Sequence, residues 1–368
     1  MRPYWRLPAT LGFLLATAEG LGARERWTLE KANAWYQERP WLVGANFTPS
    51  TAINQLEMWQ AETFSPETID REIGLAASLG FNSMRVFLHH LLWEQEGFLE
   101  RLDRFLEISD RHGIGVVLVL LDGVWDPNPR LGKQNQPRPH IHNSGWVQSP
   151  GAEILGDPGR HDELRSYIFG IVHHYRDDPR IHAWDVFNEP DNRNEGSYTA
   201  TELRDKPEKA AMLLKKVFRW AREAEPSQPL TAGVWMGPWP YEKPLAPIEA
   251  LMLEESDVVS FHSYGGLEEV RERVGQLRRF GRPVLCTEYM ARPRGSRFEP
   301  ILRYFKDEKV AAYNWGLVSG KTQTIYPWDS WSKRYTVEPA VWFHDIFRTD
   351  GTPYDPNEVR YIRSILGR

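Results

Sequence analysis

Eight short apolar runs, separated by amphipathic helical patterns, are the feature of this sequence that most restricts its fold. Several runs are nearly continuous stretches of Val, Ile and Leu, as expected of parallel strands that are covered on both faces. The predicted strands comprise residues 41–46, 83–87, 115–121, 181–187, 230–234, 258–261, 283–287 and 310–315.

The segments between these runs have the periodicity and the end signals of helices. Segment 65–80 begins with Ser and Pro and closes with Gly, which favours a capped helix start and a left-handed helix end. Segment 96–113 places Phe98, Leu102 and Phe105 on one face. This alternation predicts an α/β fold, a (β/α)8 TIM barrel, as a single domain over 27–368 with long loops after the strands.

A doubly wound sheet is the alternative fold, but no glycine-rich dinucleotide loop follows the first predicted strand. Charge is balanced, with 45 Lys and Arg against 50 Asp and Glu. This balance gives no electrostatic reason to expect a nucleic acid or an anionic membrane as partner. The 16 tryptophans offer flat apolar faces suited to stacking on sugar rings, although most of them belong in a core.

Residues 1–18 have the pattern of an export signal. Two arginines precede a short apolar stretch, and Ala16-Thr17-Ala18 fits a small-x-small cleavage site. We expect a secreted or periplasmic protein if this segment is cleaved, and a cytoplasmic one otherwise. The apolar stretch is too short for a stable membrane anchor, so no membrane association is expected after its removal. The sequence does not predict the oligomeric state.

Polar and aromatic groups follow nearly every predicted strand, where a barrel carries its chemistry. Asn188-Glu189-Pro190 follows the fourth predicted strand, and Glu288 follows the seventh. Asn and Pro are also common turn residues, so Asn188-Glu189-Pro190 could instead be an ordinary turn. The others are Asn46, Arg85, Asp122, Trp235, His262, Tyr264 and Trp315. Hydrolysis of a glycosidic bond needs two carboxyl groups, one to protonate the leaving oxygen and one at the anomeric carbon.

In this order and on these strands, the residues resemble the retaining glycoside hydrolases of clan A, most closely family 5. The resemblance covers the whole barrel. It implies a carbohydrate substrate, a β-linked glucan, mannan or xylan or a smaller glycoside, and no cofactor. It also implies Glu189 as acid/base, Glu288 as nucleophile, Asn188 as the ligand of the sugar 2-hydroxyl, and Trp315 as the platform under the sugar before the scissile bond.

The two carboxyl groups need different protonation states. We expect Arg85 and the Tyr264 hydroxyl to keep Glu288 ionised, and burial to raise the pKa of Glu189. His262 is expected to orient a carboxylate or the substrate. Strict strand alternation would send Asn188 and Glu189 to opposite faces, so the strand must end or bulge at this point.

Segment 122–160 is long for a connection in a compact domain. It is rich in proline and carries Trp125 and Trp146, so we expect an ordered wall of the substrate cleft that favours short substrates. Segment 320–331, with Trp328 and Trp331, is expected to form a second wall, unless its aromatic residues only fix their own loop.

Three histidine pairs suggest metal binding at first sight, but they lack the spacing of paired ligands and no HExxH motif accompanies them. We therefore expect no metal and interpret His89 as a substrate contact. Two rival functions stay open: a metal-dependent barrel hydrolase, which a chelator would inactivate, and a non-catalytic carbohydrate-binding barrel, which need not contain both glutamates.

Overall fold

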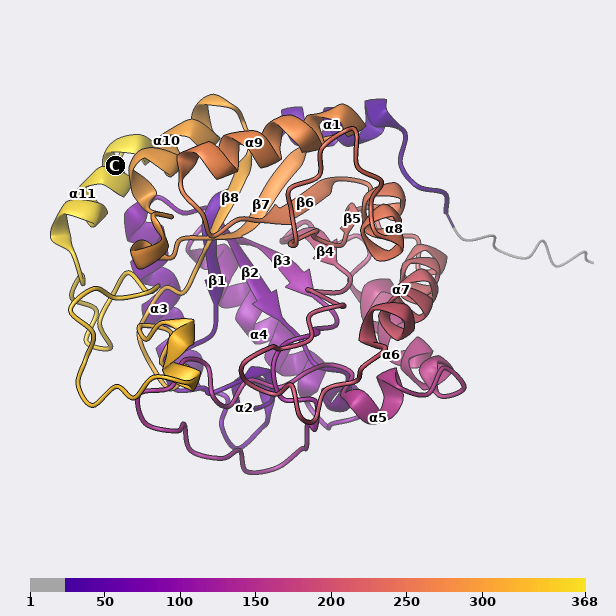
Figure 1. Ribbon diagram of the computed structural model, residues 1–368, viewed down its shortest axis with the longest axis horizontal. Helices are drawn as coiled ribbons and strands as arrows, with labels where there is room; N and C mark the ends of the chain where they lie inside the picture. The colour runs from indigo at the N-terminus through magenta and orange to yellow at the C-terminus, as the bar shows by residue number, and fades with distance from the viewer. Residues whose placement is uncertain (1–23) are drawn as a thin grey trace, which may run out of the picture.

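Eight parallel strands form a nearly closed barrel surrounded by helices in the computed structural model, which describes residues 24–368 (Figure 1). The predicted export signal lies outside the described residues. The strands are β1 (Val43–Phe47), β2 (Ser83–Phe87), β3 (Gly115–Val119), β4 (Ile181–Asp185), β5 (Leu230–Thr231), β6 (Val259–His262), β7 (Val284–Tyr289) and β8 (Ala311–Trp315). The predicted TIM barrel is thereby confirmed.

The strand order β5-β4-β3-β2-β1-β8-β7-β6 leaves one junction, between β5 and β6. A single bridge between Val234 and Phe261 joins the chain at this junction, with a 3.0 Å hydrogen bond from His262 N–H to the Val234 carbonyl. Strand β5 is shorter than predicted. Its ladder ends at Thr231 because the next amide, that of Ala232, donates to the Ser256 hydroxyl instead of to a strand.

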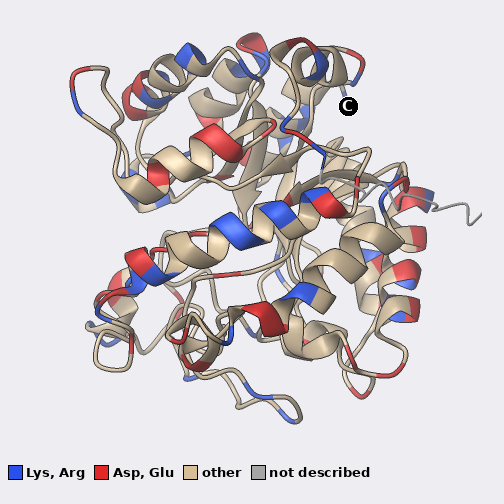
Figure 2. Cartoon of the chain, turned by 90° about the vertical axis from the view of Figure 1, so that its right-hand side faces the viewer, with Lys and Arg blue, Asp and Glu red and all other residues tan. Residues whose placement is uncertain are grey.

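The helices cover the outside of the barrel, and Lys and Arg are interspersed with Asp and Glu on their outer faces (Figure 2). They are α1 (Leu29–Gln37), α2 (Gln55–Trp59), α3 (Pro66–Leu79), α4 (Phe98–Arg111), α5 (Ala152–Leu155), α6 (Arg165–His174), α7 (Lys206–Glu223), α8 (Pro247–Glu255), α9 (Leu267–Leu277), α10 (Phe298–Asp307) and α11 (Pro356–Leu366). Short 3-10 helices occur at η1 (His90–Leu92), η2 (His161–Leu164), η3 (Arg278–Phe280), η4 (Arg292–Arg294) and η5 (Trp328–Trp331).

Helix α3 shows how the local signals act. Pro66 occupies the first helical position, and Gly80 closes the helix with a φ of +94°, a conformation that only glycine adopts without strain. Ser65 precedes the helix as predicted, but its hydroxyl contacts Thr68 at 2.9 Å and makes no capping bond to the backbone. In α4 the buried face contains Phe98, Leu102 and Phe105, as the periodicity predicts.

The bottom of the barrel is sealed by a separate apolar cluster in which Trp27 and Trp35, from the α1 region, pack with residues of the strands such as Val117 and Leu285. The opposite, carboxyl ends of the strands are covered by the long loops that follow β3 and β8 (Figure 1). Within residues 24–368, every helix is too short or too polar to cross a membrane. The mouth of the barrel is therefore the end available for chemistry.

Candidate active site

A cavity of about 540 Å³ opens at the carboxyl ends of the strands, within the range usual for small-molecule sites. Many of the residues predicted from the sequence line it: Trp125, Trp146, Asn188, Glu189, Tyr264, Glu288 and Trp315. Arg85 and His262 lie behind this lining and contact the two glutamates.

The backbone at Asn188 and Glu189 solves the alternation problem. The β4 ladder ends at Asp185, and Glu189 takes a left-handed conformation with a φ of +40°. Both side chains therefore face the cavity. Gly123, after β3, allows this close approach, because a Cβ built on it would lie 2.1 Å from the Glu189 carbonyl oxygen. The polar turn is thus fixed by the neighbouring strand end.

Glu288 lies in β7, where the register against β8 shifts between Cys286 and Tyr289. Its carboxylate is held from two sides. Arg85 donates from Nη1 to Oε1 at 2.8 Å, and the Tyr264 hydroxyl donates to Oε2 at 2.6 Å. These are the two partners that the sequence predicts for Glu288.

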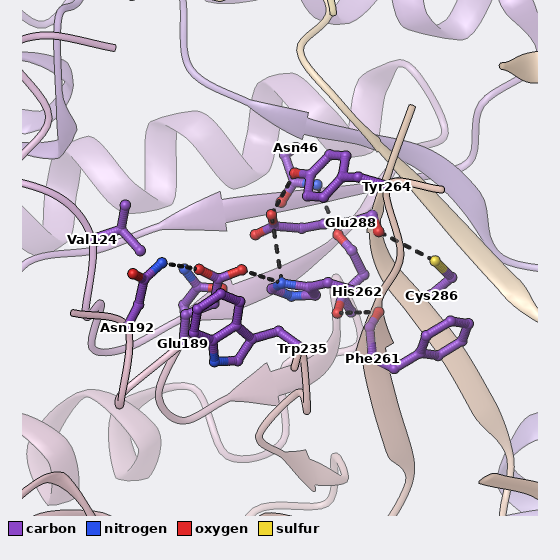
Figure 3. A network of polar contacts seen from close by, with 12 residues as sticks. Asn46, Val124, Glu189, Asn192, Trp235, Phe261, His262, Tyr264, Cys286 and Glu288 are labelled. Atoms are coloured by element: carbon purple, nitrogen blue, oxygen red, sulfur yellow. Dashed lines mark hydrogen bonds and ion pairs between the residues drawn. The ribbon is translucent and has the colours of Figure 1, made fainter. Parts of the chain in front are cut away.

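The two carboxylates converge on His262, as Figure 3 shows. The Nδ1 of His262 lies 2.7 Å from Oε1 of Glu189 and 3.6 Å from Oε2 of Glu288. One oxygen of each carboxylate and a ring nitrogen of His262 all lie within 4.8 Å of one another. An oxygen–oxygen distance of at most 4.8 Å fits the roughly 5–5.5 Å between the carboxyl groups of retaining glycosidases better than the roughly 6.5–9.5 Å of inverting ones.

Burial favours the protonated form of Glu189, which an acid catalyst needs. It raises the pKa of Glu189 to about 7, against the lowering effect of the Asn192 amide, which donates to Oε2 at 2.7 Å. Burial also lowers the pKa of His262 to about 4, so this imidazole is neutral at pH 7. Glu189 can therefore hold a proton near neutral pH without an adjacent imidazolium.

Glu288 differs in part from the expectation. His262, Arg85 and Tyr264 lower its pKa, but burial has the larger effect, so the pKa is raised overall. The sequence reveals the charge and the hydroxyl beside Glu288, whereas the degree of desolvation depends on the closed surroundings. Of the two carboxyl groups, only Glu288 pairs with a guanidinium group. When one of the two is ionised, the negative charge is therefore more stable on Glu288.

Arg85 is fully buried and uses all of its N–H groups. Nε and Nη2 donate to Oδ2 of Asp185 at 3.0 and 2.8 Å, and Nη2 also donates to Asn188 at 2.7 Å. Nη1 donates to Asn46 at 2.7 Å as well as to Glu288. Asp185 was not predicted as a site residue, although an Asp inside the apolar strand 181–187 indicates a buried charge pair.

Asp122, after β3, accepts four hydrogen bonds around Asn188. Its Oδ1 accepts from Asn188 Nδ2 at 2.9 Å and from the amide of Val124 at 3.1 Å. Its Oδ2 accepts from Trp146 Nε1 at 2.6 Å and from Gln55 at 3.0 Å. The Asn188 amide is thus held from both ends, by Arg85 and by Asp122, a role that the position of Asp122 at a strand end did not reveal.

The aromatic walls agree with the sequence only in part. Trp315 and Trp146 are packed edge to face at 6.1 Å, and both line the cavity, although Trp146 is almost completely buried. Trp125 and Trp328 also line it, whereas Trp331 lies behind Trp125 and stacks on it at 6.1 Å. Trp331 is therefore a support of the wall.

His89 does not reach the cavity, so the structure does not place it where a substrate contact was predicted. Its side chain is fully buried, with Nε2 on the Gln148 carbonyl at 2.9 Å and Nδ1 accepting from the amide of Leu91 at 3.2 Å. Both ring nitrogens are thus used by the backbone, and His89 fixes the loop after β3.

Among residues 24–368, one group combines three side chains with metal-ligand geometry: Glu189, His262 and Glu288. The histidine pairs singled out from the sequence are not part of it. The Arg85 guanidinium, 2.8 Å from Glu288, already supplies a positive charge and would repel a divalent cation. The site therefore fits acid–base and nucleophilic chemistry better than metal binding.

Comparison with known proteins supports this class of barrel. The sequence model of Glycosyl hydrolase family 10 matches residues 139–236, a segment that includes Asn188 and Glu189 but not Glu288. No curated protein sequence matches the chain.

Solved structures with a similar fold include several glycoside hydrolases. One is GH5_18 from Streptomyces cattleya in complex with GlcNAc, at 16% identity and a TM-score of 0.61, with 90% of this chain and 80% of that chain covered. An exo-beta-1,4-mannosidase from Opitutaceae bacterium strain TAV5 has 19% identity, a TM-score of 0.58 and 89% and 59% coverage. An endo-1,4-beta-D-mannanase from Thermotoga petrophila has 14% identity, a TM-score of 0.56 and 89% and 99% coverage. At these identities the comparisons show the (β/α)8 barrel fold, which this chain shares with these glycoside hydrolases.

Proposed function

We propose that this protein is a retaining β-glycosidase that hydrolyses β-linked oligo- or polysaccharides of the glucan, mannan or xylan type. The observation that carries the proposal is the convergence of Glu189 and Glu288, with one oxygen of each within 4.8 Å of the other, where burial raises the pKa of Glu189 to about 7 and Arg85 pairs with Glu288. This pair is what double displacement at an anomeric carbon needs.

In the first step, a Glu288 carboxylate oxygen attacks the anomeric carbon while the bond from this carbon to the leaving oxygen breaks. The proton of Glu189 passes to the leaving oxygen, and a covalent glycosyl ester forms on Glu288. Asn188 would bind the 2-hydroxyl of the sugar; the hydrogen bonds of its amide to Asp122 and Arg85, which fix its orientation, support this role. Trp315 provides an aromatic face beneath the ring.

In the second step, water attacks the same carbon and Glu189, now ionised, takes the proton of the water. The ester bond breaks and Glu288 returns as a carboxylate. Tyr264 and Arg85 again stabilise the negative charge on Glu288 through their hydrogen bonds at 2.6 and 2.8 Å. The anomeric configuration is retained after the two inversions.

β-Mannosides are the first substrates to test within this class. Two of the similar structures are described as a mannosidase and a mannanase, and a further one as a beta-1,4-mannanase from the sea hare Aplysia kurodai. With identities of 19% or less, these neighbours set the order of testing and not the sugar.

The decisive experiment measures sugar release from aryl β-mannosides, β-glucosides and β-xylosides and from the corresponding oligosaccharides, with the Glu288→Gln protein as the blank. Activity in the wild type alone would support the proposal. Replacement of Glu189 by Gln should slow oligosaccharide hydrolysis by about 10²–10⁴-fold, the range for general acid–base catalysis, and slow dinitrophenyl glycosides far less. Glu268→Gln, on the exposed face of α9, is the matched control.

Binding of the same oligosaccharides without turnover would instead indicate the non-catalytic carbohydrate-binding barrel. Equal losses for the Glu189 and Glu288 variants across all leaving groups would contradict the assignment of roles.

A further inference from the structure

The residues that line the cavity differ in exposure from one part of the wall to another. On the open side, after β4 and β5, its lining includes the exposed residues Arg193, Glu195 and Met236. Beside Trp125, Trp328 and Tyr264 the lining includes His142 and His344, which are only 2% and 1% exposed. We therefore expect a substrate to extend out of the site across the side that carries the exposed residues.

The closed end is a junction between the loop after β3 and the loop after β8. The amide of Asn143 donates to the Thr322 carbonyl at 2.7 Å, and the indole N–H of Trp331 donates to the His142 carbonyl at 2.9 Å. Trp331 also stacks on Trp125. These contacts join segments that are almost 200 residues apart in the sequence, and Figure 1 shows both long loops over the same end of the barrel.

The position of the acid tells which part of the substrate lies at each end. As the acid, Glu189 must lie next to the leaving oxygen. The polypeptide continues from Glu189 into the exposed rim that contains Arg193 and Glu195. The leaving group therefore exits across this open rim. The sugar that is transferred to Glu288 lies on the side of Trp315, against the closed junction.

The closed end also presents two hydrogen-bond acceptors. The Nδ1 of His142 lies 2.8 Å from the Tyr326 carbonyl, and the Nδ1 of His344 contacts the Met290 carbonyl. A carbonyl only accepts, so each Nδ1 carries the proton. Burial lowers the pKa of His142 to about 4 and that of His344 well below its usual value, so neither ring gains a second proton at neutral pH. Each Nε2 is therefore an acceptor.

Neither Nε2 contacts a hydrogen-bond partner within residues 24–368. Both rings line the cavity, 5.4 Å apart between their centroids. A sugar hydroxyl is a donor of the right kind for such an atom, whereas a glycosidic oxygen is not, since it carries no proton. The closed end is thus suited to free hydroxyl groups.

We propose that the enzyme is exo-acting: the junction between the two loops admits only a non-reducing terminal sugar, whose free hydroxyls donate to Nε2 of His142 and His344. The inference rests on the proposed glycosidase function and adds the direction of attack to it. A sugar bearing a further unit at this end would meet the wall and would lack the hydroxyl that the unit replaces.

The test uses β-1,4-linked tetrasaccharides of mannose, glucose and xylose with a fluorescent label at the reducing end, together with versions methylated on the terminal 4-hydroxyl. The labelled trisaccharide should appear first, followed by the disaccharide, and methylation should slow hydrolysis at least about a hundredfold. Early release of labelled mono- or disaccharide, or rapid cleavage of the methylated substrate, would overturn exo action while leaving the glycosidase function intact. Absence of hydrolysis of these substrates and of aryl β-glycosides would overturn both.

The acceptor role is tested with His142→Asn and His344→Asn. The amide nitrogen of Asn can replace Nδ1 and keep the bond to the carbonyl, but Asn has no counterpart of Nε2. Each variant should lose about tenfold in kcat/KM on the unmodified substrate with little change in Tm. His140→Asn, on the same loop but outside the cavity lining, is the matched control and should keep full activity. Unchanged kcat/KM in both cavity variants would contradict the role of the imidazoles.

Discussion

Arg85 and Asp185 form an ion pair in which both side chains are fully buried, with Nη2 2.8 Å from Oδ2. The pair adjoins the candidate active site, because the same guanidinium also contacts Glu288 and Asn188. A buried charge is costly unless it is paired, so the position of Glu288 depends on a charge balance that extends one residue deeper into the barrel.

Arg85→Lys should be strongly destabilising. An ammonium group has three donors and no planar fork, so it cannot replace the contacts to Asp185, Asn188, Asn46 and Glu288 together. Breaking a buried pair typically costs about 3–5 kcal/mol. The measurement is chemical denaturation, with Arg104→Lys on the exposed face of α4 as the control. A loss of less than about 1 kcal/mol would show that the network is dispensable.

Activity should decline as pH rises above neutrality. Glu189 must be protonated to act as the acid, and burial raises its pKa to about 7. The basic limb of kcat/KM should therefore fall near this pH on substrates with poor leaving groups. Dinitrophenyl glycosides need no proton on the leaving group, so kcat/KM for their glycosylation step should not fall at this pH. A basic limb of the same size for both kinds of substrate would place the titrating acid elsewhere.

Glu189→Gln should be more stable than the wild type at alkaline pH. The folded-state pKa of Glu189 is raised from an ordinary 4.5 to about 7, so the folded protein binds a proton more tightly than the unfolded chain. Its contribution to stability is present below about pH 4.5 and is lost as pH rises to about 7. Gln avoids this loss, so the variant should gain up to about 3 kcal/mol at pH 8 and nothing at pH 4. Thermal unfolding at the two pH values measures the difference.

Asp122→Asn should impair catalysis through Asn188. All four hydrogen-bond partners of Asp122 are donors, so an amide group would face at least one of them with another donor. We expect kcat/KM to fall at least about tenfold, equivalent to about 1.4 kcal/mol. A 2-deoxy aryl glycoside lacks the hydroxyl assigned to Asn188, so the effect should largely disappear with it. An equal loss on both substrates would indicate a general structural defect.

Excess EDTA should leave activity unchanged. The group formed by Glu189, His262 and Glu288 has the spacing of metal ligands, but Arg85 already neutralises Glu288. Assays before and after chelation and dialysis, with Zn²⁺ and Mn²⁺ added back, measure the effect. Inactivation that is reversed by one of these ions would favour the metal-dependent hydrolase.

The sequence was sufficient for the barrel, because continuous apolar runs and capped helices are local patterns. It also predicted that Glu189, Glu288, Arg85 and Tyr264 would lie together, since groups at the ends of parallel strands meet at one face, and the structure brings them together there. The sequence did not predict correctly which side chains point into the cavity. His89 follows β2 as closely as a site residue would, yet both its nitrogens are taken by the backbone.

Other omissions have a different cause. His142 and His344 lie in loops, where no periodicity indicates which side chains face the cavity, and their roles depend on a carbonyl beside each Nδ1. The raised pKa of Glu288 depends on how completely water is excluded, which is a property of the assembled loops. These properties arise from contacts between distant segments and have no local signature.

The junction between the loops after β3 and β8 has a consequence for the diversification of such a barrel. Glu288 and Arg85 stand on strands and Glu189 lies in the turn after β4, whereas the length of substrate that can enter is set by contacts such as Asn143 with Thr322, between two peripheral loops. Shortening either loop would open the far side of the cavity and leave the reacting groups in place. An ancestral or engineered form could thus change from trimming chain ends to cutting within chains without any change in its chemistry.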